Sequence, residues 1–296
     1  MSAVQFAAPV VSVKPVRLDA PGRGEDLLVR VSAPATGRDL PVIVFSHGFG
    51  SSADGYGPLV DYWAAHGFVV VQPTHLDSRV RALPAEDPRT PDIWRLRAED
   101  LRHAIDQLDT VAGAVPGLGG RVDPGRIAVA GHSWGAQSAS MLLGARVAGA
   151  EEDWSDSRVS AGVLFAITGT GGADLSPFAA EHFPFMSPGF EEMKTPALIV
   201  AGDRDDSMLS VRGPDWFTDA YRLSPGEKSL LTVFGAEHSL GGIPGYEARE
   251  TTDENPEAVA LQQRVSTAYL RKVLVPGDES WAGIEGGLAG RVESHE

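Results

Sequence analysis

The 296-residue sequence contains no cysteine, which excludes disulfide bonds and a thiol nucleophile. It also lacks an apolar run close to the roughly 20 residues that a membrane-spanning helix needs, so we expect no stable membrane insertion. Basic residues are few: 25 Lys and Arg face 40 Asp and Glu, and the formal net charge is −15. This excess of acid disfavours binding to nucleic acids or to anionic membranes. The absences favour a soluble globular protein with a neutral or weakly charged substrate.

Targeting and metal-binding signals are missing as well. The first 22 residues show no basic segment followed by a long apolar one, so we expect no signal peptide and a cytoplasmic protein. No His, Asp and Glu residues cluster with the spacing of metal ligands, so we expect neither a metal nor another cofactor. Without repeats or an obvious linker, residues 1–275 are predicted to form a single domain. Residues 276–296, rich in Gly and Glu, are expected to be a loosely attached tail. The oligomeric state stays open.

Short apolar runs alternate with helical patterns along most of the chain. Such runs, when flanked by helices, are typical of a parallel sheet that is buried on both faces. We therefore expect an α/β fold with a mostly parallel central sheet and helices on both sides. The expected strands are 10–18, 27–33, 42–46, 68–72 (closed by Pro73), 127–130, 161–167, 197–201 and 230–234, and the expected helices are 56–66, 91–110, 136–143 and 258–273.

The most informative motif is GHSWG at residues 131–135. It follows the apolar run IAVA and precedes a helical pattern, which is the context of a nucleophile elbow. The sharp turn strains the serine backbone, and glycine on each side leaves room for the neighbouring strand and helix. We therefore predict that Ser133 is a catalytic nucleophile.

A serine hydroxyl is a weak nucleophile that needs a base, and the base needs an orienting acid. On a sheet of this kind the base and the acid follow the serine in the sequence, on loops beyond later strands. Of the eight histidines, His238 best fits the base. Three aspartates in GDRDD, residues 202–206, compete for the acid. Asp205 is favoured, Asp203 is expected to hydrogen bond the loop backbone, and Asp206 is expected to be solvated.

Acyl transfer also needs hydrogen-bond donors for the developing oxyanion. One is expected to be the backbone N–H of Trp134, directly after the nucleophile. The other should come from the glycine-rich segment 46–52, where Phe49 is the best candidate. One such donor lowers the barrier by about 3–4 kcal/mol. His47 and His132 lie at tight turns and are expected to make structural hydrogen bonds rather than act as bases.

These residues, in this order, resemble those of an α/β-hydrolase serine esterase over roughly residues 38–275. Within that superfamily the chain is most similar to the group of platelet-activating-factor acetylhydrolases, chlorophyllases and cutinase-like polyester hydrolases. The resemblance implies the α/β-hydrolase fold and backbone oxyanion donors at Phe49 and Trp134. The chain differs from secreted polyester hydrolases, which usually carry a leader and a disulfide, and from chlorophyllases in having a tryptophan after the serine. The resemblance rests on VIVFSHGFGSSADGYGPLVDYWAAHGFVVVQPTHLDS, Arg97 and Asp100 before the elbow, GHSWGAQSA and HSLGG.

Two other segments bear on the substrate. Residues 169–193 are rich in large apolar side chains, which either wall an apolar pocket or fill the core beneath the loop. Asp77 follows the fourth expected strand and is expected to pair with Arg97 or Arg102, although contact with substrate at the rim is an alternative. The pocket candidates are Phe178, Phe183, Phe185 and Met186, with Phe190 in the same segment.

The predicted function is hydrolysis of a carboxylic ester, small or polymeric, with short to medium apolar groups. Because the chain is acidic, a neutral substrate is expected unless Arg79, Arg81 or Arg204 lines the mouth of the site. Alternatives on the same residues are a polyester hydrolase, lactonase, thioesterase or peptidase, and an acyltransferase. A non-catalytic binding protein is the least favoured hypothesis, because it would not need an intact Ser, Asp and His set.

Overall fold

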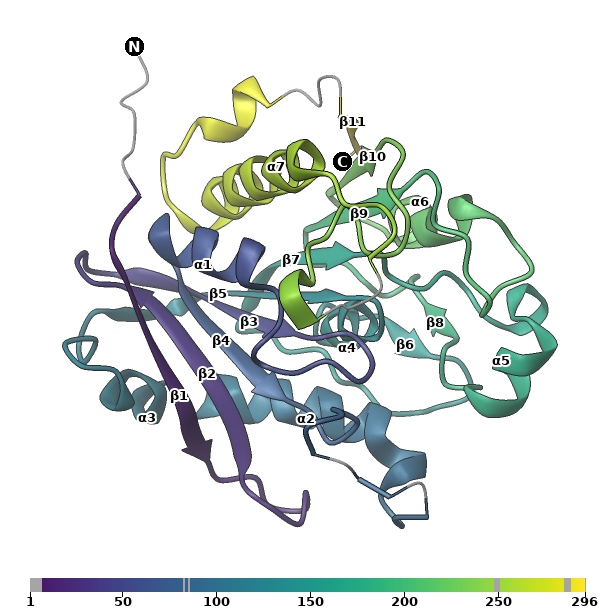
Figure 1. Ribbon diagram of the computed structural model, residues 1–296, viewed down its shortest axis with the longest axis horizontal. Coiled ribbons are helices and arrows are strands. Elements are labelled where there is room, and N and C mark those ends of the chain that lie inside the picture. The colour runs from purple at the N-terminus through teal and green to yellow at the C-terminus, as the bar shows by residue number, and fades with distance from the viewer. Residues whose placement is uncertain (1–6, 82, 85, 248–250, 285–288, 296) are drawn as a thin grey trace.

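The structure is a computed structural model that describes residues 7–81, 83–84, 86–247, 251–284 and 289–295. Its main feature is a sheet of nine strands in the described residues, in the order β1-β2-β4-β3-β5-β7-β9-β10-β11 (Figure 1). The strands from β4 to β10 run parallel, while β1, β2 and β11 are antiparallel to their neighbours. The bounds are β1 (Val10–Leu18), β2 (Leu27–Pro34), β3 (Leu40–Ser46), β4 (Val69–Thr74), β5 (Val122–His132), β7 (Val159–Phe165), β9 (Ala197–Gly202), β10 (Lys228–Val233) and β11 (Gly290–His295).

Helices cover both faces of this sheet. α1 (Gly57–Ala65) and α7 (Pro256–Leu274) pack together on one face, and α2 (Ile93–Asp106) and α4 (Trp134–Leu142) pack together on the other. The predicted mostly parallel sheet with helices on both sides is confirmed. None of the described helices has the length and apolar character needed to cross a bilayer. The shorter elements include α3 (Leu108–Ala114), α5 (Pro177–His182), α6 (Asp219–Leu223) and the strand pair β6 (Arg146–Val147) and β8 (Pro188–Gly189).

Continuous apolar runs explain the central strands. β3 and β9 are buried at every position, as expected for strands with helices on both sides. The start of α7 follows from capping chemistry: Asn255 Oδ1 accepts hydrogen bonds from the N–H groups of Glu257 and Ala258, both at 3.1 Å, and Pro256 occupies the first turn.

Several expected boundaries shift by a few residues, and two of the differences have a clear physical basis. The helix expected over 91–110 is interrupted at Gln107, which separates α2 from α3. Pro73, expected to close its strand, lies inside β4 and pairs with Val29 of β2. Because the pairing of β4 with β3 stops at Val71, the missing N–H of Pro73 removes no ladder bond on that side.

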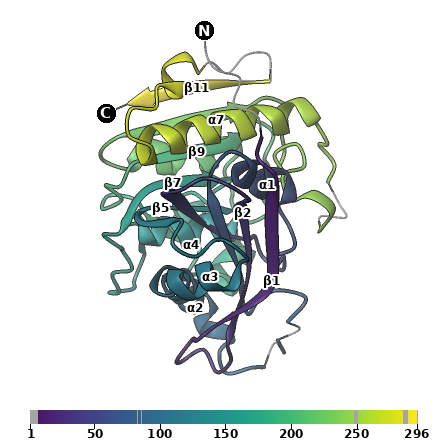
Figure 2. The same cartoon turned by 90° about the vertical axis from the view of Figure 1, so that its left-hand side faces the viewer.

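The segment expected to be a loosely attached tail includes a paired strand among its described residues. Gly290–His295 form β11, which pairs with β10 from Lys228↔His295 to Val233↔Gly290. Pairing satisfies the backbone N–H and C=O groups that β10 would otherwise expose at the edge of the sheet. In Figure 2, β11 and α7 lie at one end of the molecule and α2 and α3 at the other.

Candidate active site

Ser133 lies in the sharp turn between β5 and α4. Its backbone has φ 56° and ψ −123°, a conformation that costs free energy and that the surroundings must enforce. A Cβ on Gly135 would collide with the carbonyl oxygens of Ser46 and His47, and one on Gly131 would collide with the backbone of Gly135. The two glycines therefore let β3, β5 and α4 approach closely, and this approach holds the serine in the elbow.

A hydrogen-bonded chain connects the three predicted triad residues. His238 Nε2 lies 2.9 Å from Ser133 Oγ, and His238 Nδ1 lies 2.9 Å from Asp205 Oδ2 and 3.2 Å from Oδ1. Asp205 is 1% exposed, whereas the His238 side chain is 46% exposed. An Nδ1–H tautomer donates to the carboxylate and leaves Nε2 free to accept the serine proton.

The competition among the three aspartates has a clear geometric outcome. Only Asp205 among them contacts His238. Asp203 accepts a hydrogen bond from Gly235 N–H at 2.6 Å, which ties the loop after β9 to the end of β10. Asp206 is exposed. The structure thus gives Asp205 the position of an orienting acid and Asp203 the backbone contact expected of it.

Phe49 and Trp134, the two expected oxyanion donors, lie on adjacent segments. Trp134 is the first residue of α4, where N–H groups have no intrahelical acceptor and the helix dipole favours negative charge. Phe49 lies in the turn after β3, and its ring centroid is 5.7 Å from that of Trp134. Within the described residues, neither backbone N–H donates a hydrogen bond to another protein atom. Both are therefore available to a ligand.

His47 and His132 make the structural hydrogen bonds expected of them. His132 Nδ1 lies 3.0 Å from Tyr56 Oη, and His132 Nε2 lies 2.7 Å from the carbonyl oxygen of His238. Burial, with a smaller effect of His238, lowers the pKa of His132 to about 3, so the ring stays neutral. His47 Nε2 accepts from the N–H of His75 at 3.0 Å. Both imidazoles hold backbone segments that flank the site.

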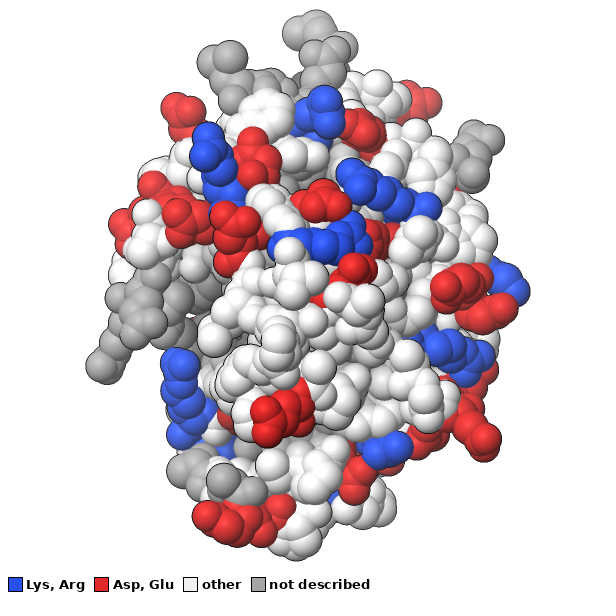
Figure 3. Space-filling view, turned by 90° about the vertical axis from the view of Figure 1, so that its right-hand side faces the viewer, with Lys and Arg blue, Asp and Glu red and all other residues white. Residues whose placement is uncertain are grey.

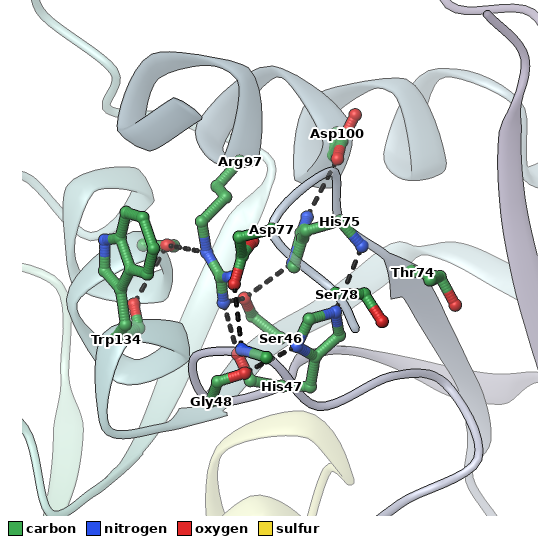
Figure 4. A network of polar contacts seen from close by, with 12 residues as sticks. Ser46, His47, Gly48, Thr74, His75, Asp77, Ser78, Arg97, Asp100 and Trp134 are labelled. Carbon is green, nitrogen blue, oxygen red and sulfur yellow. Dashed lines mark hydrogen bonds and ion pairs between the residues drawn. The ribbon is translucent and has the colours of Figure 1, made fainter. Parts of the chain in front are cut away.

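The expected pair of Asp77 with Arg97 is present and buried (Figure 4). Arg97 Nη1 lies 2.6 Å from Asp77 Oδ1, and Arg97 Nη2 donates to the carbonyl oxygen of His47. Asp77 Oδ2 accepts from Gly50 N–H at 3.2 Å. The pair therefore holds the β3 loop (residues 46–52) on both sides of Phe49. Arg102, the alternative partner, donates instead to the carbonyl oxygens of Asp153 and Ser155.

The same guanidinium also contacts the start of α4. Arg97 Nε donates to Ser138 Oγ at 3.1 Å, and Ser138 Oγ donates to the carbonyl oxygen of Trp134 at 3.0 Å. The guanidinium carbon lies 4.8 Å from the centroid of the Trp134 ring. One buried cation thus joins the two segments that carry the Phe49 and Trp134 amides.

A second Ser-His-Asp arrangement, which we did not predict, lies beneath the β3 loop. Ser46 Oγ is 2.9 Å from His75 Nε2, and His75 Nδ1 is 2.8 Å from Asp100 Oδ2. Burial is the main cause that lowers the pKa of His75 and raises that of Asp100 to about 7. All three side chains are buried, so no substrate reaches them, and the cluster is structural. Asp100, three residues after Arg97, stood out in the sequence, but no local sequence pattern predicted that it would lie close to Ser46.

Two cavities flank Ser133. One, of about 780 Å³, is lined by Ser133 and His238, and the other, of about 700 Å³, by Trp134 and aromatic residues of the 169–193 segment. Phe49 and Arg79 line both. Phe49 is 59% exposed and is in contact with both spaces. An ester held at Ser133 thus has room on two sides.

The 169–193 segment divides between the two alternatives. Phe183 and Phe185 line the second cavity, and the Phe185 ring stacks on Trp134 with centroids 5.1 Å apart. Phe178 is outside that lining and packs edge-on against Phe183. Met186 is buried in the core, as is Phe190.

On the side of the molecule that carries α5, Figure 3 shows charged side chains around a largely uncharged area.

A family model described as chlorophyllase matches residues 6–154, just over half of the chain. The chain belongs to the chlorophyllase family. This membership confirms the resemblance inferred from the sequence, and together with the fold it makes this chlorophyllase-family protein an α/β-hydrolase that acts on esters. The matched region includes Phe49, Ser133 and Trp134 and ends before Asp205 and His238. No curated protein matches the chain.

Among the described residues, no group of three or more His, Cys, Asp or Glu side chains is arranged to hold a metal ion.

Proposed function

We propose that this protein hydrolyses carboxylic esters through an acyl-serine intermediate, with Ser133 as nucleophile, His238 as base and Asp205 as orienting acid. The observation that carries the proposal is the continuous hydrogen-bonded chain from Asp205 through His238 to Ser133 at a strained elbow that opens on a cavity. A buried carboxylate, a partly exposed imidazole and a hydroxyl in this order form a nucleophile that is activated by a base.

The reaction proceeds in two halves. Ser133 Oγ attacks the ester carbonyl carbon while its proton passes to His238 Nε2, and Asp205 stabilises the resulting imidazolium. The backbone N–H groups of Phe49 and Trp134 donate to the oxyanion. His238 then protonates the departing alcohol oxygen, which leaves the acyl-serine. In the second half a water molecule attacks that ester, gives its proton to His238 and releases the carboxylic acid, while Ser133 Oγ regains its proton.

The substrates we propose have short to medium apolar groups on each side of the ester. The reason is the pair of cavities on the two sides of Phe49, one of them lined by Trp134, Phe183 and Phe185. The base and the oxyanion donors are protein groups, so the proposed steps require no metal.

The test compares wild type with Ser133→Ala on p-nitrophenyl acetate, butyrate, octanoate and palmitate, with and without EDTA. We expect turnover of the shorter esters that EDTA does not change, and a loss of several orders of magnitude in the variant. A fluorophosphonate should label wild type alone. A variant that keeps more than a few per cent of turnover, or unlabelled wild type, contradicts the assignment. Activity on palmitate only above its aggregation threshold would instead indicate a lipase, and activity lost in EDTA a metal-dependent mechanism.

A further inference from the structure

Arg79 lines both cavities, one of which also contains Ser133 and His238. Its N–H donates to the carbonyl oxygen of Gly50 at 3.1 Å, which anchors its backbone to the β3 loop. Its guanidinium group lies across Gly50: Nε is 3.1 Å and Cζ 3.4 Å from the position that a Cβ there would occupy. Gly50 directly follows Phe49, so this cation lies beside one of the two proposed oxyanion donors.

The two cavities that Arg79 lines differ in charge, because Asp77 and Glu181 line the second one, of about 700 Å³. Among the described residues that line the cavity of about 780 Å³, none is Asp or Glu, although the net charge is −15. Neighbouring arginines are neutralised: Arg81 pairs with Glu25, and Arg89 pairs with Asp87. Arg79, in contrast, has no acidic partner within 4 Å in the described part of the chain. Its charge is therefore available to a ligand.

We propose that this cavity selects esters that carry a carboxylate near the scissile bond, and that Arg79 binds that carboxylate. The inference rests on the proposed function and adds a substrate class to it. A guanidinium matches a carboxylate in shape and charge, whereas a doubly charged group would be repelled more strongly by the acidic protein. Val80 and Tyr246 in the same cavity provide apolar contact for the carbon chain. The expectation of a neutral substrate depended on a mouth without arginine, and Arg79 removes that condition.

Two pairs of substrates distinguish the two places where the carboxylate can lie. p-Nitrophenyl hydrogen glutarate, compared with the neutral p-nitrophenyl glutaramate, places it on the acyl side. 3-Acetoxybenzoate, compared with 3-acetoxybenzamide, places it on the alcohol side. Each rate is divided by the rate of hydroxide-catalysed hydrolysis to correct for intrinsic reactivity. In one of the two pairs we expect kcat/KM to favour the acid about tenfold, as for one charge-assisted contact at a half-open site, and the preference to shrink with added salt.

Arg79→Gln should abolish that preference, mainly through a higher KM for the acid, and should lower kcat/KM of the acid about tenfold more than that of the neutral partner. Arg81→Gln is the matched control. It removes the same charge two residues further along the chain, and the Arg81 side chain lines neither cavity. Glutarate or benzoate should inhibit wild type more strongly than Arg79→Gln.

Three results would overturn the proposal: no preference for the acid in either pair, the same preference in wild type and Arg79→Gln, or an equal loss in Arg81→Gln. The proposed function fails separately. If the neutral esters are hydrolysed by wild type and not by Ser133→Ala, the triad assignment stands whatever happens with the acids. If Ser133→Ala remains active, the triad assignment falls, while the comparison of Arg79→Gln with Arg81→Gln still tests carboxylate selection.

Discussion

Asp203 and Asp205 lie two residues apart on one loop, yet their contacts differ completely. Asp205 is buried and contacts the His238 imidazole, and Asp203 binds a backbone N–H. Position on the loop therefore decides which carboxylate can fix the tautomer of the histidine. Ser133 and His238 could be proposed as nucleophile and base from local patterns, but the acid needed three candidates, because sequence spacing does not show which side chain turns inward.

Asp205→Asn should lower kcat by about three to four orders of magnitude, because an amide can favour the wrong imidazole tautomer and cannot stabilise the imidazolium. Asp203→Asn keeps a carbonyl oxygen for Gly235 N–H and should cost less than about tenfold. Steady-state kinetics of both variants on one ester provides the test. Equal losses, or a larger loss for Asp203→Asn, would move the acid to position 203.

At the scale of elements, the site depends on how the β3 loop is fixed to the start of α4. Arg97 on α2 contacts both segments, and Asp77 after β4 braces the loop from the other side. Burial opposes ionisation of Asp77, but the charges of Arg97 and His47 and the hydrogen bond from Gly50 together lower its pKa below the usual value. The carboxylate therefore stays charged opposite the buried guanidinium.

Asp77→Asn should lower kcat about ten- to hundredfold with little change in KM. The loop amide would be held less well in the transition state, where one oxyanion donor contributes a factor of about 10²–10³. The affinity of a boronic acid inhibitor that mimics the tetrahedral intermediate should fall in parallel. Asp87→Asn, in a pair with Arg89 outside both cavities, is the control. A variant that is folded at the assay temperature but changed only in KM would argue against this positioning role.

The elements themselves were predictable where the signal is local and strong. β3, β9 and the segment IAVA at residues 127–130 of β5 are short apolar runs, and α7 follows an amphipathic pattern with a capping asparagine. β11, with the sequence GRVESH, carries no such signal, because its pairing depends on the edge that β10 offers. The Ser46, His75 and Asp100 cluster was missed for a similar reason: three distant segments contribute one side chain each, and only tertiary packing brings them together.

At the scale of the whole molecule, buried titratable groups tie stability to pH. Burial is the main cause that lowers the pKa values of His75 and His132 and raises that of Asp100 to about 7. The pKa of a histidine in the unfolded chain is about 6.5. Below this pH, unfolding lets both histidines take up protons, so the protein loses stability as the pH is lowered. Asp100 acts in the opposite direction between about pH 4 and 7, since its folded form holds the proton more tightly.

Two histidines against one aspartate leave a net uptake of about one proton on unfolding. The free energy of unfolding should therefore decrease, by about 1 kcal/mol per pH unit, as the pH is lowered from about 6 to 4.5. Urea denaturation at several pH values measures the slope. His132→Gln removes one of the two histidines and should leave the dependence nearly flat. A protein that becomes more stable toward pH 5, or a variant with an unchanged slope, would contradict this account.

The backbone amide and the side chain of Phe49 have different roles. Its amide, which any residue except proline would supply, is the part that we assign to bond cleavage, and the residue also lines both cavities and packs against Trp134. A new side chain at this position can reshape what is admitted while the donor to the oxyanion stays in place. Evolution or protein engineering can therefore change the side chain at position 49, and with it the substrate range, without the loss of activity that accompanies most substitutions so close to a nucleophile.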